Sequence, residues 1–315
     1  AETVRRSPPT TPPEVVISEI MYNPDTAETG DSPEWIEVAN IGGSTADLEG
    51  WFFDDEDGGS WGSFPSGTLL APGQTAVFFD VDVTEPVFRS EWSVPANALV
   101  VGITWAGLAN DPSAVNEILE LIDNEGSPVD LVNYDDANGW PSDSPDGPSI
   151  YLTDLTTDNN VGTNWARSQL GVDGGINPSG PTFSTADVGS PGILPQSADF
   201  DFSGIVDGLD FLAWQIGVGT AAPAALKVDG DADSDLDVDA ADLAFWETDY
   251  GTVSSVTALS AAIRAPASSP ASSSPLAAAS RPTLSKDVWL ALPEAAVADS
   301  SETMSETNSA LAIPV

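Results

Sequence analysis

Two acidic segments in the second half of the chain carry oxygen-bearing side chains at the spacing of calcium ligands. They cover residues 199–210 and 231–242, an offset of 32 residues. In both, Asp or Ser falls at loop positions 1, 3, 5, 9 and 12, the pattern of EF-hand-type loops. Calcium takes about six to eight oxygens, and position 7 adds a carbonyl. The spacing predicts two calcium ions, with ligands from Asp199, Asp201, Ser203, Ile205, Asp207 and Asp210, and from Asp231, Asp233, Asp235, Asp237, Asp239 and Asp242.

The two loops differ at position 6, where a sharp turn is required. Gly204 occupies it in the first loop and allows a positive φ, whereas Leu236 occupies it in the second. We expect strain in the second turn, or a different path. Position 12 is Asp in both loops, where an EF-hand usually has Glu. Because the crowded carboxylates repel one another without metal, calcium binding and folding should be coupled.

A short apolar helix should follow each loop and position its last ligand. Apolar residues recur at the i, i+3, i+7 spacing of a helix face. The first face consists of Phe211, Trp214 and Val218, and the second of Leu243, Trp246 and Tyr250. Since these residues keep the 32-residue offset, the two helices should present equivalent faces.

The preceding part of the chain indicates an all-β domain without a helical stretch. Short β-prone runs are separated by turns rich in Gly, Pro, Asp and Asn, which favours a β-sandwich over a barrel. The expected strands cover 15–22, 34–39, 48–53, 75–79, 98–103, 117–122, 128–132 and 149–152. Beyond them, Trp165 should pack at the edge of the sandwich. We predict a proline-rich linker (1–13), the sandwich (14–193), the loop–helix repeat (198–252) and a disordered Ala/Ser/Pro-rich tail (253–315) with a short apolar segment at 287–292.

Composition excludes several classes of function. The formal charge is −42, from 50 acidic and 8 basic residues, which disfavours nucleic acid and anionic membranes. The chain has no Cys and no His, which removes disulfides, the Ser-His-Asp triad and the common zinc sites. No apolar run approaches the roughly 18–20 residues of a membrane helix. No signal peptide is visible, but the calcium loops favour an extracellular or cell-surface location.

Three weaker patterns could suggest catalysis or sugar binding. Residues 58–62 match a Ser-nucleophile motif, but no His exists to activate Ser60. Glu19, Glu34 and Glu37 could form the acid pair of a glycosidase, but we interpret them as solvent-facing strand residues. The acidic run 54–57 is interpreted as an exposed turn. Three tryptophans are less easily assigned to the expected strands, namely Trp61, Trp92 and Trp105. A carbohydrate-binding face, on which sugars stack against such rings, therefore stays an alternative.

The repeat resembles a type I dockerin, with two loop-then-helix units of this length. The resemblance implies a protein partner of the cohesin type, bound through the helices. Well-studied members contact that partner with a Ser-Thr pair at positions 10 and 11, where this chain has 208–209 (Gly-Leu) and 240–241 (Ala-Ala).

The β part resembles the bacterial extracellular lamin-tail domain. The resemblance rests on segments 17–24, 34–37, 47–51, 64–73 and 118–126, closed by 164–165 and 189–192. It implies an immunoglobulin-like sandwich that accompanies secreted or surface enzymes without being a catalyst.

The sequence therefore predicts a mainly β protein: an immunoglobulin-like sandwich, a small α-helical dockerin-like domain and a disordered tail. We expect a secreted, non-catalytic adhesion or assembly protein whose repeat docks on one partner while the sandwich contacts another. The alternatives are an accessory part of a polysaccharide-degrading system and a carbohydrate-binding sandwich.

Overall fold

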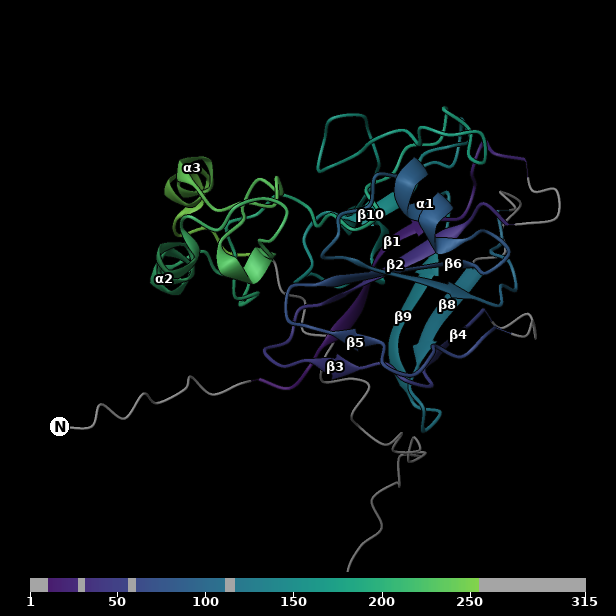
Figure 1. Ribbon diagram of the computed structural model, residues 1–315, viewed down its shortest axis with the longest axis horizontal. Coiled ribbons are helices and arrows are strands. Elements are labelled where there is room, and N and C mark those ends of the chain that lie inside the picture. Colours follow the sequence, from purple (N-terminus) through teal and green to yellow (C-terminus); the bar gives the residue numbers. More distant parts are fainter. Residues whose placement is uncertain (1–10, 28–31, 56–60, 111–116, 255–315) are drawn as a thin grey trace, which may run out of the picture. The chain divides into compact units, whose positions relative to one another are not determined.

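The computed structural model describes residues 11–27, 32–55, 61–110 and 117–254 (Figure 1). The chain divides into two units, Ala1–Ala265 and Pro266–Val315, and all described residues lie in the first. Most of the predicted linker and tail therefore lie outside the described residues, as do Ser60 and the segment 287–292. The predicted domain boundaries stay predictions.

A six-stranded sheet forms the larger layer of the β part. Its order is β11-β10-β1-β2-β6-β7, in which β6 and β7 are parallel and the other neighbours antiparallel. The strands are β1 (Val15–Met21), β2 (Trp35–Asn40), β6 (Thr75–Asp80), β7 (Leu99–Ile103), β10 (Ile150–Leu152) and β11 (Trp165–Arg167). As predicted, Trp165 lies at the edge of this sheet and is buried.

Two smaller sheets complete the β part. One pairs β3 (Ala46–Asp47) with β5 (Leu69–Leu70), and the other has the order β4-β8-β9, from β4 (Phe52–Asp54), β8 (Glu117–Ile122) and β9 (Pro128–Tyr134). Alternate side chains of β1, β2 and β6 form one core cluster with residues from β4, β8 and β9, such as Phe53, Leu119 and Val132. This mainly β architecture fits the immunoglobulin-like sandwich that the sequence predicts.

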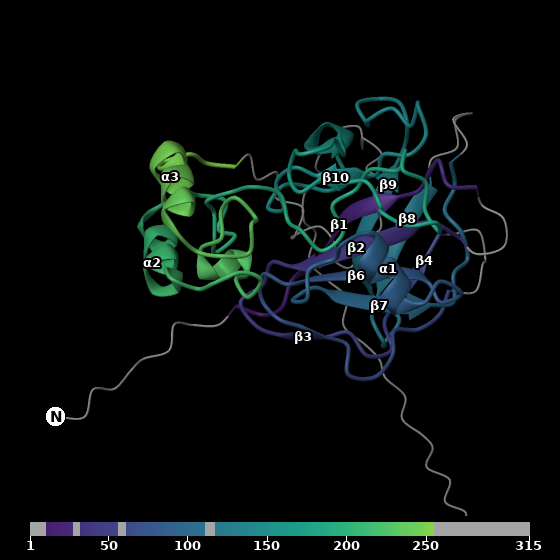
Figure 2. The same ribbon diagram turned by 45° about the horizontal axis from the view of Figure 1, so that its top comes forward.

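The expectation of a β part without helices is wrong, because α1 (Glu85–Glu91) lies between β6 and β7. Proline lies in its first turn, where a missing N–H costs nothing. Its Phe88 is fully buried against Phe79 and Trp35, in a cluster separate from the main core. Helix α1 thus packs on the large sheet (Figure 2). Strands β2 and β6 are therefore covered on both faces.

The interpretation of Glu19, Glu34 and Glu37 as solvent-facing residues is also wrong. Their exposed fractions are 1%, 3% and 1%. Glu19 and Glu37 are cross-strand neighbours on β1 and β2, and residues 189–192 cover them. That segment lies so close that a Cβ on Gly189 would lie 2.6 Å from Cζ2 of Trp35.

The tryptophans considered for sugar stacking contact other aromatic side chains. Trp61 and Trp105 lie edge to face with ring centroids 4.7 Å apart, and Trp61 also contacts Phe53. The indole N–H of Trp105 donates to Glu34 at 2.7 Å. Trp92 is 1% exposed. Their packing gives no support to a stacking platform.

Candidate metal centres

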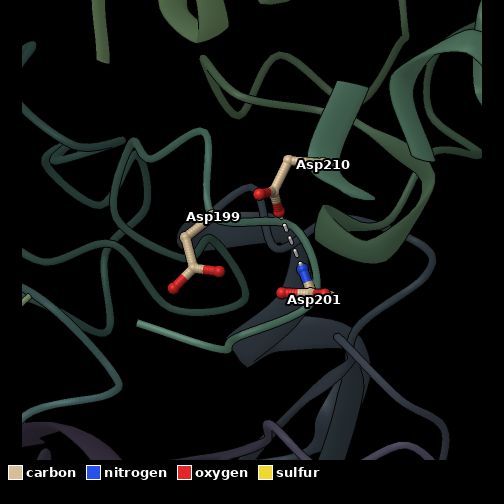
Figure 3. Close-up of side chains that lie close together, drawn as sticks. All are labelled: Asp199, Asp201 and Asp210. Carbon is tan, nitrogen blue, oxygen red and sulfur yellow. Dashed lines mark hydrogen bonds between the residues drawn. The ribbon is translucent and has the colours of Figure 1, made fainter. Parts of the chain in front are cut away.

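The first loop brings three of its predicted ligand residues together. Carboxylate oxygens of Asp199, Asp201 and Asp210 lie within 4.8 Å of one another (Figure 3). Asp207 lies apart from this group, because its side chain caps α2 (Gly208–Gly217) by accepting from the Leu209 N–H at 2.7 Å. The remaining two predicted ligands contact each other, since the Ser203 hydroxyl donates to the Ile205 carbonyl at 3.2 Å.

Backbone amides hold the first and last carboxylates of this loop. Asp199 accepts from the Ser203 N–H at 3.0 Å and from the Gly204 N–H at 2.7 Å, and Gly204 has a φ of +78°. Asp210 accepts from the Phe200 N–H at 2.7 Å and from the Asp207 N–H at 2.8 Å. One carboxylate at the start of α2 thus joins both ends of the loop.

The second loop repeats these contacts before α3 (Ala240–Asp249). Asp242 accepts from the Ala232 and Asp239 N–H groups, both at 2.7 Å. Asp231 accepts from the Leu236 N–H at 3.0 Å, as Asp199 does from Gly204. The carboxylates form two groups, one of Asp231, Asp233 and Asp235 and one of Asp237, Asp239 and Asp242. The structure therefore does not gather all predicted ligands of this loop at one point.

Leu236 follows the same backbone path as its glycine counterpart, with a φ of +70°. Of the two outcomes expected for this position, the structure shows the strained one. A left-handed conformation costs an ordinary residue roughly 1–2 kcal/mol, and this cost falls on the turn that aligns the second set of carboxylates.

Replacing Leu236 should separate backbone strain from side-chain packing. We expect Leu236→Gly to be more stable than Leu236→Ala by about 1 kcal/mol, because both lose the side chain but only glycine relieves the positive φ. Urea unfolding of the repeat, followed by circular dichroism, measures the difference. An alanine variant as stable as the glycine variant would show that the turn is not strained.

The donor set of both loops fits calcium, because every candidate ligand offers a hard oxygen. A further observation comes from the second loop, where one oxygen each of Asp231 and Asp237 is buried without a hydrogen-bond partner. A buried carboxylate oxygen without a partner is costly unless something else satisfies it. Burial is also the main reason why the pKa values of Asp199 and Asp231 rise to about 6.

The two loop–helix units are interlocked by reciprocal bonds that sequence reasoning missed. The Trp214 indole N–H donates to the Asp239 carbonyl at 2.7 Å, and the Trp246 indole N–H donates to the Asp207 carbonyl at 2.8 Å. Both pairs obey the 32-residue offset. The recurrence of Trp at this offset was the available signal, but spacing alone does not show that each indole contacts the other unit.

The apolar helix faces are only partly as predicted. Phe211 and Trp246 pack together with ring centroids 4.9 Å apart, while Val218 and Tyr250 are 48% and 61% exposed. A second apolar row on α2 faces solvent, formed by Leu209, Leu212 and Ile216. The α3 positions at the same offset hold smaller residues, namely Ala241, Ala244 and Thr248.

Comparison with known proteins bears on the β part. No curated protein matches the chain. Among solved structures, a DUF4876 family protein from Bacteroides thetaiotaomicron shares 12% sequence identity at a TM-score of 0.28, over 60% of this chain and 73% of its own. No helix in the described residues is long and apolar enough to cross a membrane. Residues 8–136, which contain β1 to β9, match the family model of the lamin tail domain.

Proposed function

We propose that the loop–helix repeat is a calcium-stabilised, dockerin-like module that attaches the chain to a protein partner of the cohesin type. The observation that carries this proposal is that the same hydrogen bonds close the loop in both units. Asp210 and Asp242 make the same amide contacts, Asp199 and Asp231 each hold the turn at position 6, and Asp231 retains a buried oxygen without a partner.

Calcium would be held by the side-chain oxygens at loop positions 1, 3, 5 and 12, all of them carboxylates except the Ser203 hydroxyl, together with the position-7 carbonyls of Ile205 and Asp237. A bound divalent cation would neutralise the mutual repulsion of these acids. The side chains at positions 9 and 12 of each loop also cap the following helix, so the fold itself holds the loop in position against that helix. Calcium binding would thereby fix the orientation of α2 and α3.

The docking surface would be the exposed row on α2. Leu209, Leu212 and Ile216 are 60%, 47% and 78% exposed, and their spacing places them on one face of the helix. Exposed apolar residues grouped in this way are typical of interaction sites. The repeat holds thirteen acidic residues, so a partner with an apolar centre and a basic rim would complement it.

The sandwich would contact a second partner and would not be a catalyst. Its buried acids act as hydrogen-bond acceptors within the fold: Glu34 accepts from Trp105 and Leu108, and Glu19 accepts from Ser149 and Ser190. We place the protein outside the cell or on its surface, where calcium is abundant enough to fill such loops.

Surface plasmon resonance with an immobilised cohesin domain tests the docking function. We expect the full chain to bind in calcium and to dissociate in EDTA. Ile216→Asp should weaken binding at least tenfold, because it places a charge in the apolar row. Thr248→Asp, at the matching position on α3, is the control and should bind normally. If the unaltered chain binds none of a panel of cohesin domains in calcium, the proposed partner class is wrong.

A further inference from the structure

The loop–helix repeat contains thirteen acidic residues and one basic residue, Lys227. It lies in η2 (Lys227–Asp229), immediately before the second loop, and its exposed fraction is 5%. Its ammonium donates to the carbonyls of Ser197 and Ala232, at 3.1 Å and 3.2 Å. Ala232 is position 2 of the second loop, between the candidate ligand residues Asp231 and Asp233.

The surroundings of this ammonium differ from those of an ordinary buried ion pair. No carboxylate among the described residues forms a salt bridge with it. Burial lowers the pKa of Lys227 to about 8, while the charges of Asp231 and Asp242 act in the opposite direction. Burying an ammonium group without an ion-pair partner costs free energy. The negative charges that act on it here include the carboxylates at loop positions 1 and 12.

The first loop has no corresponding cation. The residue at the same offset is Pro195, and residues 195–210 contain no Lys or Arg. Yet the second loop is the more acidic of the two, with Asp at positions 1, 3, 5, 7, 9 and 12. The extra negative charge and the buried positive charge therefore occur in the same unit.

We propose that Lys227 is an internal counter-ion of the second loop, which partly neutralises its carboxylates without metal and opposes calcium when it binds. The inference rests on the proposed calcium function and adds a difference between the sites. The second loop keeps its shape without metal better than its acidity alone would allow. It also binds calcium more weakly than its six aspartates would otherwise permit.

Calorimetric titration of the full chain with calcium tests this role, using an Asp199→Ala background in which only the second loop binds. Lys227→Gln keeps a donor for the Ser197 and Ala232 carbonyls but removes the charge, and Lys227→Met removes both. We expect each to lower the dissociation constant of this site about tenfold, which corresponds to about 1.4 kcal/mol. Lys227→Arg keeps the charge and should leave the affinity within about twofold of the parent.

Thermal unfolding in EDTA supplies the second measurement. Both neutral variants should melt at a lower temperature than the parent without metal, and saturating calcium should remove the difference. If the parent binds calcium but the neutral variants bind it no more tightly, the counter-ion role is refuted while the calcium function stands. If the unaltered chain, with both loops intact, binds no calcium, both fail. A neutral variant that stays unfolded in saturating calcium also refutes the role, because the ion should replace the lost charge.

Discussion

Calcium titration of the full chain should release heat for two ions and increase the helical circular dichroism signal, and EDTA should reverse both effects. The reason is electrostatic: the first loop holds four carboxylates and the second holds six, and the position-12 carboxylates at the start of α2 and α3 belong to the clusters that they form. An ion present at one hundred times its dissociation constant stabilises the folded state by about 2.7 kcal/mol per site. For a repeat of this size, that is a large share of its stability.

Asp199→Ala gives the sharpest form of this prediction. It removes a carboxylate that is a proposed calcium ligand and that also accepts from the Ser203 and Gly204 amides. We expect the stoichiometry to fall from two ions to one, and the thermal midpoint of the repeat in calcium to fall with it. Glu49→Ala, which removes an exposed carboxylate from the β part, is the matched control for charge and should still bind two ions.

The measurement can also contradict the proposal. Absence of heat on calcium addition, with an unchanged helical signal, would show that the acidic loops are solvated turns without an ion. Loss of both sites on Asp199→Ala would show instead that the two loops fill only together. The reciprocal bonds of Trp214 and Trp246 would then be the first place to look for the coupling.

Strand positions could be predicted where one face of a strand contacts the core. In β2, Ile36 and Val38 alternate with Trp35 and Glu37, and this period of two indicates a strand. It does not show which segment packs on the second face of the strand. That face is covered by α1 and by residues 189–192, which are distant in sequence. A period of two therefore cannot show that Glu19 and Glu37 are buried. From sequence alone, a carboxylate on such a strand is expected to face solvent, because ionised residues are seldom buried.

The short helix α1 was missed for a different reason. With seven residues it has too few turns for apolar periodicity to stand out between two strands. Its one local signal was Thr84-Glu85-Pro86, a common sequence at helix starts. The loop–helix repeat was more accessible, since ligand spacing, capping and helix start all depend on residues within twelve positions. What spacing did not reveal are contacts between distant segments, such as the two indole bonds and the bond from Lys227 to the Ser197 carbonyl.

Neutralising Glu37 should make the β part more stable at pH 8 and less sensitive to pH. Glu37 is buried beside Glu19, and within the described part of the chain it accepts from the Ser18 hydroxyl and the Gly192 N–H alone, at 2.8 Å and 2.6 Å. Burial, followed by the charge of Glu19, holds the pKa of Glu37 well above its usual range. Glu19 has more donors, from Ser149, Ser168 and Ser190, although burial raises its pKa as well.

The sign of the pH dependence follows from these raised pKa values. A carboxyl group whose pKa is higher in the folded state binds its proton more tightly there, so it favours folding below its unfolded pKa of about 4.5. That contribution is lost as the pH rises through the folded-state pKa. The β part should therefore lose stability between weakly acidic and weakly alkaline pH, and Glu37→Gln should remove most of the loss. The expected gain at pH 8 is about 1–3 kcal/mol.

Urea unfolding from pH 5 to pH 8, followed by tryptophan fluorescence in saturating calcium, measures this effect. Glu19→Gln is the informative partner variant. It should be less stable than Glu37→Gln at every pH, because an amide cannot accept all the hydrogen bonds that converge on Glu19, and a buried donor without a partner costs about 1–3 kcal/mol. Glu49→Gln, on the exposed surface, should follow the parent. A Glu37→Gln variant that is less stable than the parent at pH 8 would mean that the ionised pair stabilises the sheet, because the 189–192 segment would then depend on two charged acceptors.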